Sequence, residues 1–249
     1  MSTQPIQTLQ SKHFVVILSY TLAITLFAAV GIRAQQMRAG ISVNMAETNN
    51  ALPMPAADQA DAWIVTVPRD GRVFFGTTLI APEGLANEIK HNYRSDRMMY
   101  IKADSRAPYT AIEKVITMAH AAGTGSVILL TAQPDRQKNW QVPKGLEVRL
   151  ALTAGVSPAV IHVVASAEGS ATVRINGQPV DWNTLQRSLA DLPLPNEKTA
   201  LVNADGRLSF AQLARVIDLC TAAGFRVVLA TNNLNSKSAP CHAERRTRS

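Results

Sequence analysis

The first 45 residues of this 249-residue chain contain no aspartate or glutamate, although the whole chain has 18 acidic residues. Cysteine is also scarce, with two residues, so no framework of disulfide bonds holds the fold together. Aromatic residues make up 5% of the chain and lie apart from the basic clusters, which argues against nucleic-acid binding by base stacking. The hydrophobic content of 47% is sufficient for one or two ordinary cores.

No pattern of catalytic or metal-binding residues stands out. The histidines show no ligand spacing, and the sequence has neither a glycine-rich phosphate loop nor a Ser/His/Asp arrangement. Asp104 and Asp205 each lie between an expected strand and an expected helix, where helix capping is favoured over an active site. We therefore expect no enzyme activity, no metal and no cofactor. The histidines are His13, His91, His120, His162 and His242.

The chain is basic, with 25 lysines and arginines and a formal net charge of +7. Such an excess favours anionic partners such as lipid headgroups. Residues 234–249 end in a cluster of arginines, and a solvated, disordered basic tail is the simpler interpretation. Cys241 lies in this tail, whereas Cys220 is expected on an apolar helix face as a small core residue. A disulfide between the two cysteines stays open.

One apolar run is long enough to cross a membrane. Residues 14–32, FVVILSYTLAITLFAAVGI, carry no charge over 19 positions, and a helix of this length spans roughly 28 Å. Lys12 precedes the run and Arg33 and Arg38 follow it, so charge does not settle the orientation. The alternative is a signal peptide cleaved after Gly31. Because the apolar core of a signal peptide is shorter, about 7–15 residues, we favour a transmembrane anchor.

The remainder of the chain contains an internal repeat. The stretch ADSRAPYTAIEKVITMAHAAG, followed by VILLT, returns as ADGRLSFAQLARVIDLCTAAG, followed by VVLAT. Asp104, Tyr109 and Gly123 correspond to Asp205, Phe210 and Gly224, each 101 residues further along the chain. Self-similarity at one spacing indicates a structural unit that is used twice.

Apolar patterns predict the same order of elements in both copies: strand, strand, helix, strand, helix, strand. In the first copy the expected strands are 63–67, 73–75, 99–101 and 127–130, and the expected helices begin at Pro82 and near Tyr109. In the second copy the expected strands are 161–164, 172–175, 201–202 and 227–229, with helices around Leu185–Leu189 and from Phe210 to Cys220. Gly123 and Gly224 are placed to end the longer helices. The sequence thus predicts an α+β fold of two tandem ββαβαβ units, with the helices on one sheet face.

A further strand is expected before each unit. Residues 41–45 alternate apolar and polar, and 146–150 is their counterpart in the second copy. Residues 46–61, AETNNALPMPAADQAD, have no apolar period and are interpreted as a linker. Each isolated strand lacks a tight-turn partner, so it has to pair with a sheet edge of its own chain or of another subunit.

This order of anchor, isolated strand, proline-rich linker and ββαβαβ unit resembles the ExbD/TolR family. The matching stretches are ISVNM before the linker, the hairpin ending at Gly76, and A-D-x-x-x-x-Y-x-x-x-x-K-V with A-x-x-A-G and L-L-T after it. The resemblance covers roughly residues 14–131, and its soluble part recurs over about 146–233.

The resemblance implies a single-pass protein of the bacterial inner membrane, with its bulk in the periplasm. Its implied partner is a multi-span ExbB/TolQ-like channel, and the complex would use the proton gradient to drive a TonB- or TolA-like protein. Self-association is also implied. The expected segments are a cytoplasmic amino terminus (1–13), a transmembrane helix (14–32), a strand with linker (33–61), unit 1 (62–133), a connector with a strand (134–159), unit 2 (160–233) and the basic tail (234–249).

The chain departs from the family at one functional position. The membrane helix of the family normally carries an aspartate after a proline, and this acid takes up and releases the proton. Counting back from ISVNM places the expected acid at Thr21, next to Tyr20. A threonine hydroxyl has no pKa near neutrality and cannot cycle a proton as a carboxylate does.

Two functions follow from this departure. In the first, the chain is a working subunit of a proton-driven ExbB–ExbD or TolQ–TolR-like complex, and the proton is carried by the channel partner or by a second ExbD-like chain. In the second, it is a non-conducting accessory or scaffold that binds periplasmic partners or peptidoglycan. In either case, we predict that the two units pack against each other on one anchor.

Overall fold

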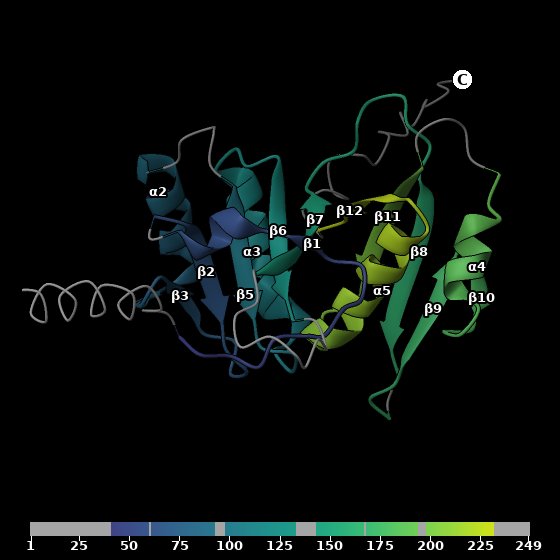
Figure 1. Cartoon of the computed structure of the whole chain (residues 1–249), viewed down its shortest axis with the longest axis horizontal. Coiled ribbons are helices and arrows are strands. Elements are labelled where there is room, and N and C mark those ends of the chain that lie inside the picture. Colours follow the sequence, from purple (N-terminus) through teal and green to yellow (C-terminus); the bar gives the residue numbers. More distant parts are fainter. Residues whose placement is uncertain are drawn as a thin grey trace, which may run out of the picture. The chain divides into compact units, whose positions relative to one another are not determined.

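The computed structural model describes residues 41–59, 61–92, 98–132, 143–166, 168–193 and 198–231 (Figure 1). The expected membrane segment 14–32, with Tyr20 and Thr21, lies outside these residues, as do Cys241 and the tail 234–249. Within the described part, no helix is long and apolar enough to span a bilayer.

Both copies form a mixed α/β unit, as the sequence predicts. Unit 1 consists of β2 (Trp63–Val67), β3 (Val73–Phe75), β4 (Thr78–Ile80), α2 (Pro82–Asn92), β5 (Met99–Ala103), α3 (Tyr109–Ala121) and β6 (Ser126–Thr131). Unit 2 consists of β8 (Ala159–Ala165), β9 (Ala171–Ile175), β10 (Gln178–Val180), α4 (Leu185–Ala190), β11 (Thr199–Ala204), α5 (Phe210–Ala222) and β12 (Arg226–Leu229).

Each unit has one strand more than the sequence predicted, because a tight hairpin extends it. Two-residue turns at Gly76–Thr77 and Asn176–Gly177 lead into β4 and β10. Gly76, Asn176 and Gly177 have φ values of 60°, 50° and 87°, the left-handed conformations that two-residue hairpins require. The Asn-Gly pair is a strong hairpin signal that the prediction missed. The order in each unit is therefore βββαβαβ.

The two units share one sheet of twelve strands, and β7 (Lys144–Arg149) joins them. The strand order is β10-β9-β8-β11-β12-β7-β6-β5-β2-β3-β4, and the short β1 (Leu52–Pro53) pairs with one end of β7. β7 runs antiparallel to β6 of unit 1 and parallel to β12 of unit 2. The expected connector thus contains a central strand of the sheet (Figure 1).

The strand expected at 41–45 does not form. Its counterpart β7 lies beside β12, so residues 41–45 would have to lie beside β6, and β7 already occupies that edge. Met45 and Glu47 make only isolated bridges, to Asp104 and Ala132. The expected linker, in contrast, contains secondary structure: β1 and a 3₁₀ helix, η2 (Pro55–Asp58).

The main core lies between the helices and one face of the sheet. Alternate strand residues such as Val65, Ile101 and Ile161 pack there against Ile112 and Leu213 of the two long helices. The opposite face of unit 1 holds a smaller cluster in which Ala57 of η2 covers Tyr100, Ile128 and Leu130. The helices therefore cover one face, as predicted, and the segment before β2 covers part of the other.

Candidate functional site

The segments that lead into α3 and α5 pair with each other and connect the two units. Pro108 and Ser209 form an antiparallel bridge at the centre of this contact. Four backbone hydrogen bonds surround it: Tyr109 N to Leu208 O at 2.8 Å, Phe210 N to Ala107 O at 2.9 Å, Thr110 N to Gly206 O at 3.1 Å and Ala211 N to Ser105 O at 2.9 Å. We call residues 105–111 and 206–212 the seam.

The seam has a pseudo-two-fold axis. Adding 101 to a residue of the first copy converts Tyr109 N–Leu208 O into Phe210 N–Ala107 O, with the direction of the bond reversed. The outer pair of hydrogen bonds is related in the same way, and the Pro108–Ser209 bridge maps onto itself. The same surface patch is thus used twice, which defines an isologous contact. One chain contains both halves of a symmetric pair.

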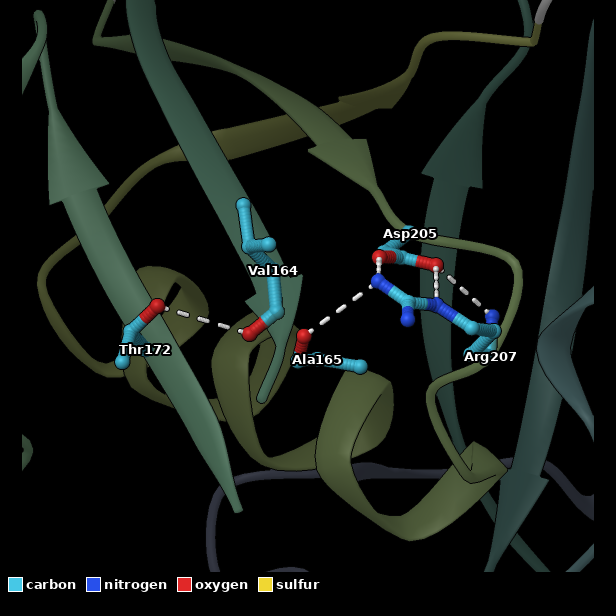
Figure 2. Close-up of polar contacts among 5 residues, drawn as sticks. All are labelled: Val164, Ala165, Thr172, Asp205 and Arg207. Atoms are coloured by element: carbon cyan, nitrogen blue, oxygen red, sulfur yellow. Dashed lines mark hydrogen bonds and ion pairs between the residues drawn. The ribbon is translucent and has the colours of Figure 1, made fainter. Parts of the chain in front are cut away.

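Asp205 lies immediately before the seam, at the end of β11, where it forms a tight turn with Arg207 (Figure 2). Its carboxylate accepts hydrogen bonds from Arg207 N at 2.9 Å, Nε at 3.2 Å and Nη2 at 2.7 Å. Arg207 Nη2 also donates to Ala165 O at 3.4 Å, which ties the turn to the end of β8. The hydrogen bonds of the Arg207 side chain and backbone lower the pKa of Asp205 to about 2.

Asp104 forms the corresponding turn in unit 1. It accepts from Arg106 N at 3.0 Å and Nε at 3.1 Å, and also from Asn44 N at 3.3 Å. The side-chain hydrogen bond of Arg106 lowers the pKa of this carboxyl group.

The expectation that Asp104 and Asp205 cap helices is wrong. Helix α5 is capped by Ser209 in a capping box with Gln212, and the N-cap of α3 is Pro108, which has no side-chain cap.

Residues 44–50, which we call the N-terminal strap, contact both units. In unit 1, Asn44 O accepts from Ser105 N at 2.7 Å, and Ala46 O accepts from Ala132 N at 2.9 Å. Thr48 N donates to Ala132 O at 2.9 Å, and the Thr48 and Thr131 hydroxyl oxygens are 2.7 Å apart. The strap therefore crosses the carboxyl ends of β5 and β6.

Asp218 on α5 holds the other end of the strap. It accepts hydrogen bonds from Asn49 N at 3.1 Å, Asn50 N at 2.8 Å and Asn50 Nδ2 at 3.1 Å. Asp218 is 5% exposed, and its counterpart in α3 is Thr117. A buried carboxylate requires such partners, because desolvation without hydrogen bonds is costly. The prediction missed Asp218, although an acid on an apolar helix face was a local signal.

The other repeat positions named from the sequence lie in the core or at helix ends. Tyr109 and Phe210 are the first residues of α3 and α5, and both side chains are fully buried. Gly123 and Gly224 follow these helices at φ values of 96° and 81°, which suits glycine after a helix end. Cys220 is buried, and this burial raises its pKa to about 12, so its thiol is unreactive at neutral pH.

The described residues contain no group of three or more histidine, cysteine or acidic side chains placed to hold a metal ion. The aspartates at the site instead bind arginine side chains and backbone amides of the same chain. The arrangement is suited to holding segments together, with the strap and the seam as its two contacts. Neither contact presents a nucleophile beside a general base.

Comparison with known protein families gives a match. A family model described as biopolymer transport protein ExbD/TolR matches residues 17–134 and again residues 131–234. The two matches together span 17–234, and each contains one copy of the repeat. No curated protein and no solved structure matches the chain.

Proposed function

From the premise that the chain belongs to the ExbD/TolR family of biopolymer transport proteins, we propose that it is a working subunit of a proton-driven complex of the bacterial inner membrane. Residues 14–32 form its single membrane helix, and the two units lie in the periplasm. Its partner is an ExbB/TolQ-like channel protein, and the complex energises transport across the outer membrane, or its maintenance, through a TonB- or TolA-like protein.

The observation that carries this proposal is the attachment of the N-terminal strap to both units. The strap begins at Asn44, 12 residues after the end of the apolar run at Ile32. Because Asp104 and Asp218 hold its two ends, a displacement of the membrane helix would be transmitted to unit 1 and unit 2 together. Such coupling is what a subunit needs when it transmits movement from a membrane motor.

In this proposal the proton is carried by another chain. No acidic residue occurs before Glu47, and a threonine at the family position does not titrate near neutrality. An ionisable residue inside a membrane is costly and is retained where it has a function, so its absence here favours division of labour between subunits. The same absence supports the second candidate, a non-conducting scaffold that binds periplasmic partners or peptidoglycan.

A complementation experiment tests the proposal. The full-length chain is restored to cells that lack it, together with the membrane protein that co-purifies with it, and proton-dependent transport is measured. We expect wild-type protein to restore transport and Asp218→Ala to reduce it while the membrane partner still co-purifies. Full transport with Asp218→Ala would contradict coupling through the strap and would favour the scaffold.

A second variant addresses the missing acid. Thr21→Asp places a carboxyl group at the position where the family has one. If the chain descends from a proton-carrying subunit, this variant should acquire or raise proton-dependent activity without the second ExbD-like chain. Unchanged activity would show that Thr21 is not the former proton site.

A further inference from the structure

The two outer edges of the sheet, β4 and β10, occupy corresponding places but differ chemically. Both are three-residue strands that follow a two-residue turn. In the registers, Leu79 lies opposite Phe74 and Pro179 lies opposite Arg174. Among the described residues, β4 pairs only with β3 and β10 only with β9, so each strand has one free edge. The duplication therefore provides an internal comparison of two edges.

The direction of the backbone groups follows from the hydrogen bonds at the turns. Gly76 N donates to Ile64 O at 3.2 Å, and Asn176 N donates to Val160 O at 2.7 Å. Since successive residues of a strand alternate in direction, Phe75 and Ile175 direct their N–H and C=O groups towards β4 and β10. Thr78 and Gln178, which pair with Phe75 and Ile175, therefore direct their backbone N–H and C=O groups inwards, towards β3 and β9. The backbone groups of the middle residues, Leu79 and Pro179, therefore point outwards, away from the sheet.

The outward-facing residue differs between the two edges. Proline has no N–H group, so Pro179 removes the donor that an additional strand beside β10 would use. Leu79 retains this donor and is 56% exposed. Proline and charged residues protect edge strands from pairing, and the sequence Thr78-Leu79-Ile80 contains neither. The edge of unit 2 is protected, and the edge of unit 1 is open.

The two side chains nearest the open edge, Leu79 and Phe74, are apolar. Thr66, Phe74 and Leu79 form one row across β2, β3 and β4, because they are paired in the register. The corresponding row in unit 2 is His162, Arg174 and Pro179. Arg72 packs over the ring of Phe74 at 5.4 Å and forms an ion pair of 2.6 Å with Asp70. A strand added to β4 would lie beside Leu79 and Phe74, whereas one added to β10 would lie beside Pro179 and the cationic Arg174.

We propose that β4 binds the β4 strand of a second copy of this chain, in antiparallel orientation and centred on Leu79. In this register the outward N–H and C=O groups of Leu79 in one copy bond to those of Leu79 in the other. Thr78 lies opposite Ile80, and Leu79 and Phe74 of both copies form one apolar row across the contact. The strand carries no charge, so pairing with itself brings no like charges together.

The occupant is a second copy because the contact closes on itself. Each copy contributes the same three residues, so the pairing is isologous and stops at two chains. Pairing of β4 with β10 would instead propagate into a filament, and the missing donor of Pro179 opposes it. Two backbone hydrogen bonds make a weak contact that cross-linking can trap. The inference does not depend on the proposed transport role.

Disulfide trapping in full-length protein tests the contact. Leu79→Cys is prepared with Cys241→Ser, and the matched control is Thr78→Cys in the same background, because in the proposed register Thr78 lies opposite Ile80 and not opposite itself. Hydrogen-bonded partners in an antiparallel pair have Cα atoms about 5.5 Å apart, within the range of a disulfide. The two Thr78 positions would lie diagonally, about 7–8 Å apart, which is too far for a disulfide. In detergent micelles under mild oxidation, we expect Leu79→Cys to form several times more covalent dimer than Thr78→Cys.

A measurement without cross-linking supplements this test. The mass distribution of the full-length chain is measured by sedimentation over a range of concentrations, with circular dichroism to verify folding. We expect Leu79→Lys to reduce the dimer fraction by repulsion, and Pro179→Leu to produce species larger than a dimer because it opens the second edge.

Three results would overturn the proposal. The first is equal cross-linking by Leu79→Cys and Thr78→Cys. The second is an unchanged mass distribution for folded Leu79→Lys protein. The third is cross-linking of Leu79→Cys, in membranes of the expressing cells, to a different polypeptide only, which would assign the edge to another partner.

Discussion

At the scale of single residues, the duplication gives most positions a counterpart in the other unit, and the differences locate specialised positions. Asp218 and Thr117 are such a pair, on equivalent turns of α5 and α3. Asp218 binds the strap, and no described contact of this kind involves Thr117. The strap is therefore attached asymmetrically to an otherwise repeated helix.

Asp218→Ala should lower the free energy of unfolding by about 2 kcal/mol or more, because three hydrogen bonds to a carboxylate are lost. The amides of Asn49 and Asn50 should then exchange with solvent faster. Denaturant unfolding and hydrogen exchange measure the two effects. Thr117→Ala is the matched control and should have little effect on the unfolding free energy or on amide exchange. Equal effects of the two substitutions would show that Asp218 has no special role.

A second residue-scale prediction concerns pH. The folded-state pKa of Asp205 is about 2, below its ordinary value of 3.8, so its ionised form stabilises the fold. This contribution is fully present above about pH 4 and is lost as the pH falls through about 2. Arg207→Gln should raise the pKa of Asp205 towards the ordinary value, while the pKa of Asp104 stays low beside Arg106.

The pKa values of Asp205 and Asp104 are measured from the NMR chemical shifts of their carboxyl carbons. The difference in unfolding free energy between wild type and Arg207→Gln should shrink as the pH falls from about 4 to about 2. If the difference stayed constant over this range, the Asp205–Arg207 turn would contribute nothing through its charge.

At the scale of elements, the sequence predicted the helices and most strands because their signals are local. The helical period that predicts α3 and α5 involves residues close together in the sequence, and so do the apolar runs that predict β5, β6 and β12. The pairing of β7 with β6 and β12, and the contact of the strap with Asp218 across 168 residues, join distant segments. No local period encodes such pairings, so they were not predictable.

The seam illustrates how two copies diverged together. A Cβ atom at Gly206 would collide with the methyl group of Thr110. On the symmetric side the corresponding residues are Ser105 and Ala211. The larger residue of the first copy thus lies against glycine, and the smaller residue of the second copy lies against serine. The two changes compensate each other.

This compensation predicts a coupled double mutant. Gly206→Ser alone should cost about 1–3 kcal/mol of stability, because overpacking forces the seam apart. Thr110→Ala with Gly206→Ser makes both sides of the seam identical and should recover most of the loss. Denaturant unfolding of the wild type, of Gly206→Ser, of Thr110→Ala and of the double variant gives the coupling energy, and strictly additive effects would show that the two residues do not share a contact.

At the scale of the whole molecule, the described part of the chain contains two ExbD/TolR-type units that share one sheet and one pseudo-symmetric seam. Both copies belong to one compact unit of the chain. The resemblance stated from the sequence named the family correctly, and the repeat predicted two units. That β7 serves both units emerged only from the structure, because the sequence left the partner of each isolated strand open.

The most direct test of this account is a disulfide across the seam of the full-length chain. Pro108 and Ser209 form a bridge that is flanked by hydrogen bonds, and such non-hydrogen-bonded partners have Cα atoms about 4.5 Å apart, within disulfide range. In Cys241→Ser protein, Pro108→Cys with Ser209→Cys should form a disulfide within one chain under mild oxidation, as identified by peptide mass mapping. Disulfides only between chains, or none in folded protein, would contradict the account.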